Sequence, residues 1–116
     1  MKVVKSSDIA KKPVEVAGAK DVEIRWLISR DDGADNFAMR MFELKPGGFT
    51  PLHTHPHEHE VFVIEGRGVF VYEGKEHEFC PEYVIFVPGG KEHQFRNTGD
   101  SILRFLCLIP ASAAQS

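Results

Sequence analysis

Four of the chain's six histidines fall within one seven-residue segment, His53-Thr54-His55-Pro56-His57-Glu58-His59. Successive side chains of an extended strand point to opposite faces, so His53 and His55 share a face and can hold a single ion together. Imidazole nitrogen is a preferred ligand for Zn, Cu, Fe and Ni. A further histidine, His93, follows the turn sequence Pro88-Gly89-Gly90. These residues predict a metal site assembled from two separated segments. The alternative is a solvated, histidine-rich loop without an ion.

Two of the remaining histidines are weaker ligand candidates. His57 has the parity of His53 and His55, but Pro56 should bend the chain there, so a place on the surface or beside the ligands is expected. His77 lies in the charged tripeptide Glu76-His77-Glu78, which is typical of an exposed strand edge. We therefore expect His77 at the surface.

The elements that must position these histidines are short strands separated by turns. Runs rich in Val, Ile, Phe and Tyr alternate with Gly-, Pro- and Asn-containing turns such as Pro46-Gly47-Gly48 and Gly66-Arg67-Gly68. The expected strands are residues 22–29, 37–44, 61–65, 69–73, 76–80, 83–87, 93–97 and 102–109. This spacing predicts an all-β sandwich or barrel. The first dozen residues and residues 111–116 look like loose ends.

Length and composition limit the classes of protein. The 116 residues suit one domain, and 14 Lys and Arg against 17 Asp and Glu give a net charge of −3, which argues against nucleic-acid binding. No apolar run approaches the ~20 residues of a membrane helix. The N-terminal residues lack an apolar signal core, so we expect a cytoplasmic protein. Cys80 and Cys107 are too few for a disulfide framework and should remain thiols.

Two motifs in this order resemble those of the cupins, a superfamily of metal-binding β-barrels. Gly47, five residues and His53-Thr54-His55 match the start of the first motif, and residues 88–97, Pro-Gly-Gly-Lys-Glu-His-Gln-Phe-Arg-Asn, match the second. The resemblance implies a single-domain jelly-roll barrel (a double-stranded β-helix) over residues 1–116. Its metal-binding core would span about residues 36–110, after an N-terminal arm of residues 1–20. It also implies His53, His55 and His93 as ligands.

The fourth ligand departs from the usual cupin pattern, in which it is a glutamate. Both His59 and Glu60 are candidates, and strand alternation alone does not decide between them. The family's six-residue spacing to the glycine of the next turn, here Gly66, selects His59. The set then resembles that of small four-histidine cupins, and Glu60 would point away. Four neutral imidazoles would leave the ion its full 2+ charge, which makes it a stronger Lewis acid.

The last strand indicates which side chains surround the ion. If Arg104 faces outward, then Leu103, Phe105 and Cys107 face the barrel interior; Phe95, two residues after His93, should line the same space. Cys107 either approaches the metal or fills the core. Arg40, in the apolar run Met39-Arg40-Met41-Phe42, either reaches inward to bind an acidic substrate or projects outward to pair with an acid. The predicted substrate pocket consists of Phe95, Phe105, Cys107 and Arg40.

Several functions are compatible with such a site. Four ligands on an octahedral ion leave two positions open, which favours a dioxygenase-like oxidoreductase acting on a small chelating molecule, with Mn or Fe favoured and Zn, Ni, Co or Cu also suitable. The alternatives are a non-redox isomerase or decarboxylase, and a ligand-binding protein without turnover. Residues 83–87 and 102–109 are apolar on both strand faces, and a second copy would cover them, so we expect a homodimer.

Overall fold

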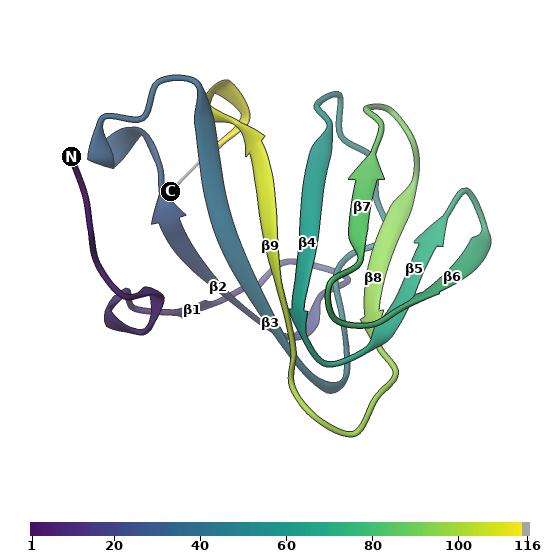
Figure 1. Cartoon of the computed structure of the whole chain (residues 1–116). Helices are drawn as coiled ribbons and strands as arrows, with labels where there is room; N and C mark the ends of the chain where they lie inside the picture. Colours follow the sequence, from purple (N-terminus) through teal and green to yellow (C-terminus); the bar gives the residue numbers. More distant parts are fainter. Residues whose placement is uncertain (115–116) are drawn as a thin grey trace.

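The computed structural model describes residues 1–114, which form a curled antiparallel sheet (Figure 1). The strands are β1 (Lys12–Pro13), β2 (Lys20–Ile28), β3 (Phe37–Phe49), β4 (His59–Glu65), β5 (Gly68–Tyr72), β6 (Lys75–Phe79), β7 (Val84–Val87), β8 (His93–Asn97) and β9 (Leu103–Pro110). Three short 3-10 helices, η1 (Ser6–Asp8), η2 (Arg30–Asp32) and η3 (Ala111–Ala113), lie outside the sheet. None of the helices in this part of the chain is long and apolar enough to cross a membrane.

The strands follow the order β6-β5-β8-β3-β9-β4-β7, and β2 pairs with β3 and with β1. The long strand β3 connects the two parts of the sheet. It pairs with β9 over Phe37–Leu44, and at its far end Phe49 pairs with Arg96 of β8. The sheet curls around an interior, and its path ends at β6 and β7 (Figure 1). The predicted all-β barrel-type fold is confirmed.

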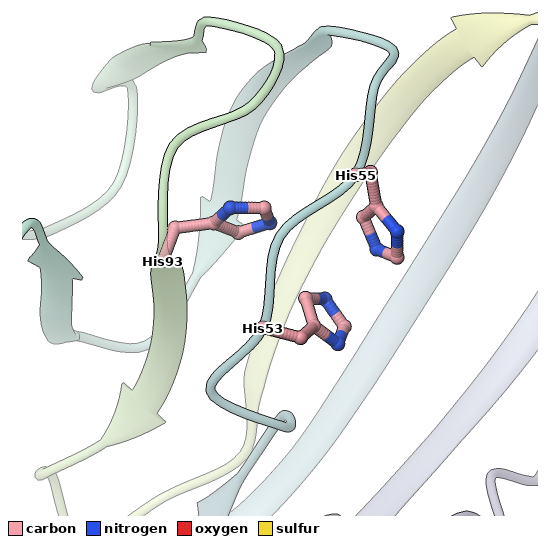
Figure 2. A group of neighbouring side chains, drawn as sticks. All are labelled: His53, His55 and His93. Carbon is pink, nitrogen blue, oxygen red and sulfur yellow. The ribbon is translucent and has the colours of Figure 1, made fainter.

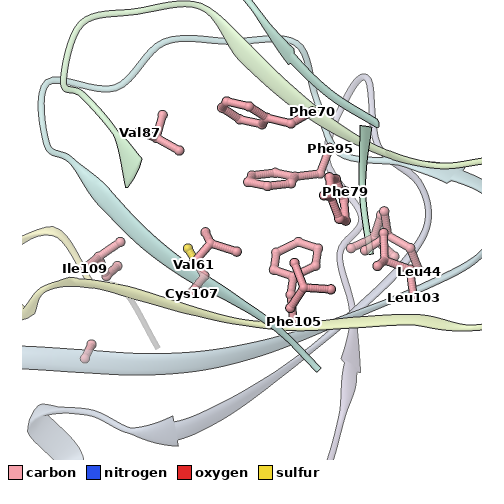
Figure 3. Packing of buried hydrophobic residues seen from close by; sticks show 13 residues of the cluster. Leu44, Val61, Phe70, Phe79, Val87, Phe95, Leu103, Phe105, Cys107 and Ile109 are labelled. Carbon is pink, nitrogen blue, oxygen red and sulfur yellow. The ribbon is translucent and has the colours of Figure 1, made fainter. Parts of the chain in front are cut away.

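The interior is filled mainly by aromatic rings. Phe95 stacks on Phe105 with ring centroids 4.7 Å apart and lies 4.9 Å from Phe70, while Phe79 meets Phe95 edge-on (Figure 3). Strand alternation explains this arrangement. On β9, Leu103, Phe105 and Cys107 are buried, and Arg104 points outward to Glu43 and Glu65. Replacing a fully buried ring such as Phe105 by Ala typically costs about 3–5 kcal/mol.

The strands lie close to the ranges predicted from the sequence. Three features differ from the expectation: residues 46–48, the N-terminal arm and the C-terminal end. β8 has the predicted bounds, but Pro46-Gly47-Gly48 lies within β3 instead of forming a turn. Gly47 has a φ of 82°, and the β2–β3 register shifts opposite it.

The N-terminal arm is not loose. β1 pairs with β2, and Arg25 donates hydrogen bonds to the carbonyls of Ser6 and Ile9. Ala111 is also buried, whereas residues 115–116 of the expected loose end lie outside the described residues.

Candidate metal centre

Backbone hydrogen bonds join the two histidine-bearing segments. His53 N–H donates to the carbonyl of His93 (3.2 Å), and His93 N–H donates back to His53 (3.0 Å), forming an isolated antiparallel bridge. Gly90 N–H donates to the carbonyl of His55 (2.6 Å). The loop before β4 is therefore fastened to the turn before β8, which fixes the histidines of one segment against the histidine of the other.

The rings of His53, His55 and His93 gather in one place (Figure 2). Each offers a nitrogen, and these three nitrogens lie within 4.8 Å of one another. The ring centroids of His53 and His55 are 4.1 Å apart, and that of His93 lies 5.1 and 5.7 Å from them. Such a set can close on one ion through small side-chain rotations, since a metal–imidazole bond is about 2.0–2.1 Å long.

His59 borders the same cluster from the first position of β4. It is only 6% exposed, and its ring centroid lies 5.3 Å from His55 and 5.2 Å from His93. The closest grouping of its nitrogens is with His55 and His57, again within 4.8 Å, so the structure does not gather the four predicted ligands into one group. Glu60, the competing candidate, is exposed on the opposite strand face.

Hydrogen bonding shows whether the ring nitrogens suit a metal. Nδ1 of His93 lies 2.9 Å from the carbonyl of Lys91, which can only accept, so Nδ1 carries the proton and Nε2 keeps a free lone pair. Nε2 of His59 is buried without a partner among the described residues. A protonated Nε2 there would be an unpaired buried donor, costing about 1–3 kcal/mol. With the proton on Nδ1, Nε2 is a free ligand atom, so the site fits a cation.

On the other side of the ring, His59 Nδ1 lies 3.3 Å from the Cys107 sulfur, which can donate or accept, and 3.3 Å from the Arg40 Nη2, which can only donate. The same Nη2 donates to the sulfur (3.0 Å). Arg40 therefore favours Nδ1 as the acceptor, and a cation at Nε2 would reverse that preference. Cys107 is 2% exposed, and this burial raises the pKa of its thiol, an effect that Arg40 opposes. Cys107 therefore fills the core and contacts His59 at Nδ1, the ring nitrogen opposite the candidate ligand atom Nε2.

Burial sets the charge of the cluster. Desolvation, followed by the repulsion of neighbouring cationic groups, lowers the pKa of His55 to about 4 and that of His59 to about 3. The same causes, with His93 the first repelling neighbour, lower the pKa of His53. These imidazoles are neutral at neutral pH, which is the form that binds metal ions.

The histidines form one wall of a cavity of about 520 Å³. All the predicted pocket residues (Arg40, Phe95, Phe105 and Cys107) line it, together with Val14, Val16, Ala17, Val22, Ile24, Phe42, Thr50, Pro51, Leu52, His53, His55, His59 and His93. Except for the histidines, Arg40 is the one charged side chain in this lining. A second cavity of about 500 Å³, between β6 and β7, holds His77 but none of the clustered histidines.

Arg40 points into the cavity, which resolves the alternative left open by the sequence. Its guanidinium lies 4.9 Å from the Phe42 ring centroid and 5.7 Å from that of Trp26. No carboxylate pairs with it among residues 1–114, and its Nε is buried without a partner. A cation held by aromatic faces and neutral groups can bind an anionic oxygen.

Sequence reasoning missed the part of the cavity wall that comes from the N-terminal arm. Val14, Val16 and Ala17 lie between charged residues, and Val14 packs against the core. The alternation of Val14 and Val16 in an otherwise polar arm is the signal that could have placed the arm against the sheet.

Comparison with known proteins agrees with this geometry. Residues 40–109 match the family described as the cupin domain. The chain belongs to the cupin family. This cupin is 34% identical over 113 residues to an oxalate-binding protein of Thermotoga maritima, with 92% of each chain covered. It is 37% identical over 73 residues to a 1-methylthio-D-xylulose 5-phosphate methylsulfurylase of Rhodospirillum rubrum. That match covers 63% of this cupin, which spans about half (47%) of the longer protein.

Solved structures include similar cupins. The polyketide cyclase RemF from Streptomyces resistomycificus has a TM-score of 0.90 and 39% identity, covering 96% of this chain and 80% of its own. A predicted oxalate decarboxylase of Thermotoga maritima has a TM-score of 0.84 and 30% identity, covering 94% and 98%. These comparisons place the chain in the cupin family, and its histidine clusters could hold a metal ion.

Proposed function

We propose that this cupin is a metal-dependent enzyme acting on an organic molecule that combines an apolar body with at least two oxygens able to chelate an ion. The observation that carries the proposal is the histidine cluster, with the buried Nε2 of His59, in the wall of an apolar cavity whose one other charged group is Arg40. A cavity of about 520 Å³ with this lining suits a ligand larger and less polar than a small dianion.

In this proposal His53, His55, His59 and His93 hold one divalent transition metal ion, Mn or Fe by preference, with Zn, Ni, Co and Cu also compatible with the donors. When bound, the ion acts as a Lewis acid that stabilises negative charge on a coordinated oxygen. The Lys91 carbonyl keeps His93 in the tautomer that ligation requires, and the Cys107 sulfur can accept the Nδ1 proton of His59 when Nε2 binds the ion.

The protein side chains supply binding and orientation. Phe42, Phe95 and Phe105 contact the apolar body of the ligand and exclude water from the histidine side of the cavity. Arg40 donates hydrogen bonds to an anionic oxygen, such as an enolate, phenolate or carboxylate, next to the histidines. The anionic oxygen of the ligand would then pair with the Arg40 guanidinium, which has no acidic partner among the described residues.

Two reaction types remain candidates. The likeness to the polyketide cyclase RemF favours a redox-neutral rearrangement or ring closure of an enolisable, aromatic or polyketide-like substrate, in which Arg40 stabilises the enolate. The all-histidine donor set favours the second candidate, a dioxygenase-like oxidation of a chelating substrate. Ligand binding without turnover is the third outcome.

The experiment is a turnover assay with metal-reconstituted protein against catechols, β-diketones, 2-hydroxy acids and poly-β-keto aromatic compounds, run with and without oxygen. Metal-dependent product formation that persists without oxygen supports the redox-neutral reaction. Stoichiometric oxygen uptake supports the dioxygenase-like reaction. If the substrates bind without any product forming, the protein is a ligand-binding cupin and the enzymatic proposal is wrong.

We also propose a homodimer. An apolar band crosses the outer sheet face along the paired residues Val84, Phe62 and Leu106 of β7, β4 and β9. Val84 is 75% and Phe62 42% exposed, and no described residue covers them. The strand β7 ends the sheet, and its sequence Val-Ile-Phe-Val has no charge or proline that would protect an edge.

A second copy of the chain brings the same free edge and the same band, so the two can pair about a two-fold axis. Light scattering should give twice the 13.0 kDa chain mass, and Phe86→Glu, which places a charge on this exposed edge, should give the single chain mass. A monomeric wild type would contradict the dimer.

A further inference from the structure

The histidine cluster contains a second three-histidine group, and one of its members, His57, has no part in the proposed metal centre. Besides His53, His55 and His93, the residues His55, His57 and His59 place one nitrogen each within 4.8 Å of one another. The ring of His57 stacks on that of His55, with centroids 4.8 Å apart and planes 15° from parallel, and lies 4.9 Å from the centroid of His59. Pro56 therefore does not turn His57 away from its neighbours.

His57 approaches the cluster from outside the substrate cavity. The other four clustered histidines line that cavity and His57 does not. Next to His57 in the chain, Glu58 is exposed. A carboxylate close to His57 along the chain raises the local concentration of cations. The cluster thus has one side that lines the substrate cavity and another, at His57, that lies outside it.

The two three-histidine groups cannot both hold an ion with complete ligand sets. They share His55, and His59 belongs to the outer group while it also borders the inner one. Two divalent cations a few ångströms apart would in addition repel each other strongly. The groups are therefore alternative positions for one ion, and the shared histidines allow it to exchange one ligand at a time.

We propose that His57 belongs to a metal-entry position: a divalent cation binds first to His55, His57 and His59, at the side outside the substrate cavity, and then passes to the inner position, where His53 and His93 replace His57. No bond to the protein other than metal–nitrogen bonds forms or breaks in this exchange. The inference rests on the proposed metal centre. It adds a route by which the ion enters without passing through the substrate cavity.

Kinetics distinguish an entry residue from a final ligand. A group that binds the ion only on the route lowers the barrier in both directions, so its removal slows uptake and release by the same factor and leaves the affinity unchanged. The experiment measures Co²⁺ uptake by metal-free protein with a chromophoric Co²⁺ indicator in a stopped-flow instrument, and Co²⁺ release into excess EDTA. The variants are His57→Gln, His53→Gln for the inner position, and His77→Gln as a control remote from the cluster.

We expect His57→Gln to slow both uptake and release by about tenfold, the effect of about 1.4 kcal/mol on the barrier, with an unchanged dissociation constant. His53→Gln should weaken equilibrium binding, and His77→Gln should match the wild type. Wild-type rates in His57→Gln would overturn the entry position, and so would a weakened equilibrium affinity, because His57 would then be a final ligand. Absence of Co²⁺ binding by the wild type would contradict the metal centre itself, a result distinct from the first two.

Discussion

Gly89 lies so close to the carbonyl oxygen of Pro56 that a Cβ atom on residue 89 would collide with it. This contact, together with the hydrogen bond from Gly90 N–H to the carbonyl of His55, presses the turn before β8 against the histidine loop. Gly89, which precedes the motif glycine Gly90, thus has a steric reason of its own: the two halves of the site meet backbone to backbone.

Gly89→Ala should therefore displace the histidine loop. We expect a loss of about 1–3 kcal/mol in unfolding free energy, typical of overpacking, and a weaker metal affinity because His55 and His93 no longer align. Chemical denaturation and metal titration measure the two effects. Gly99→Ala is the matched control, since its Cβ would meet the flexible side chain of Arg67. Wild-type metal affinity in Gly89→Ala would show that the contact does not position the site.

Arg40→Gln should impair ligand binding and spare the metal. Removing a charge-assisted hydrogen bond costs about 1.5–3 kcal/mol, or roughly 10–100-fold in the affinity for an anionic ligand. Metal affinity should be retained or slightly increased, because a cation next to His59 has been removed. Isothermal titration with a chelating enolate or phenolate measures the first effect. Arg96→Gln, whose exposed guanidinium lies near Glu76, serves as the control. Metal loss with intact ligand binding would contradict this role.

The metal-free protein should lose stability in mild acid. In the folded chain the pKa of His55 is about 4 and that of His59 about 3, whereas the ordinary pKa of histidine is 6.5. Below pH 6.5 the unfolded chain therefore binds protons that the folded chain does not, and the free energy of unfolding decreases as the pH falls toward about 4. Above pH 6.5 these two groups add no pH dependence.

Thermal unfolding of EDTA-treated protein between about pH 7 and pH 4.5 measures this effect. The His59→Gln variant should show a shallower decrease than the wild type, because one depressed histidine is gone. Added metal should reduce the loss of stability, since the ion competes with protons for the same nitrogens. An equal pH dependence in wild type and variant would contradict the burial of a neutral His59.

His59 and Glu60 offer a direct test of ligand identity on adjacent positions of one strand. His59 is buried in the cluster and Glu60 is exposed on the other face. His59→Gln should weaken metal binding by at least the roughly 10–100-fold that even a supporting residue contributes, and Glu60→Gln should leave it unchanged. Competition with a chelator of known affinity gives both values. The reverse result would make Glu60 the ligand.

The sequence predicted the strands well because their local signals agree with the tertiary structure. β8 and β9 alternate between buried and outward residues, so Phe105 and Cys107 could be placed inside from Arg104, and Phe95 from His93. It failed where tertiary pairing overrides local preference. Pro46-Gly47-Gly48 has turn chemistry, yet β2 pairs with β3 on both sides of this segment and β8 pairs with Phe49 beyond it, so the irregularity remains only as a shift in register.

In the candidate site, too, local sequence signals predict some features, and contacts between distant segments determine the others. The motifs identify the candidate histidines, since spacing and parity are local properties. The direction of Arg40 and the contribution of the arm depend on contacts between distant segments, such as that of Arg40 with Cys107. The closeness of His57 to His55 depends on the backbone path through Pro56, which residue types alone do not specify.

The central claim is that histidines from two separate segments bind one cation. X-ray diffraction with anomalous scattering, on crystals of protein loaded with Mn²⁺ or Co²⁺, tests it most directly. The account predicts one anomalous peak per chain, bonded to nitrogens of His53, His55, His59 and His93. A peak bonded to Glu60 in place of His59, or no peak among these histidines in metal-saturated crystals, would contradict it.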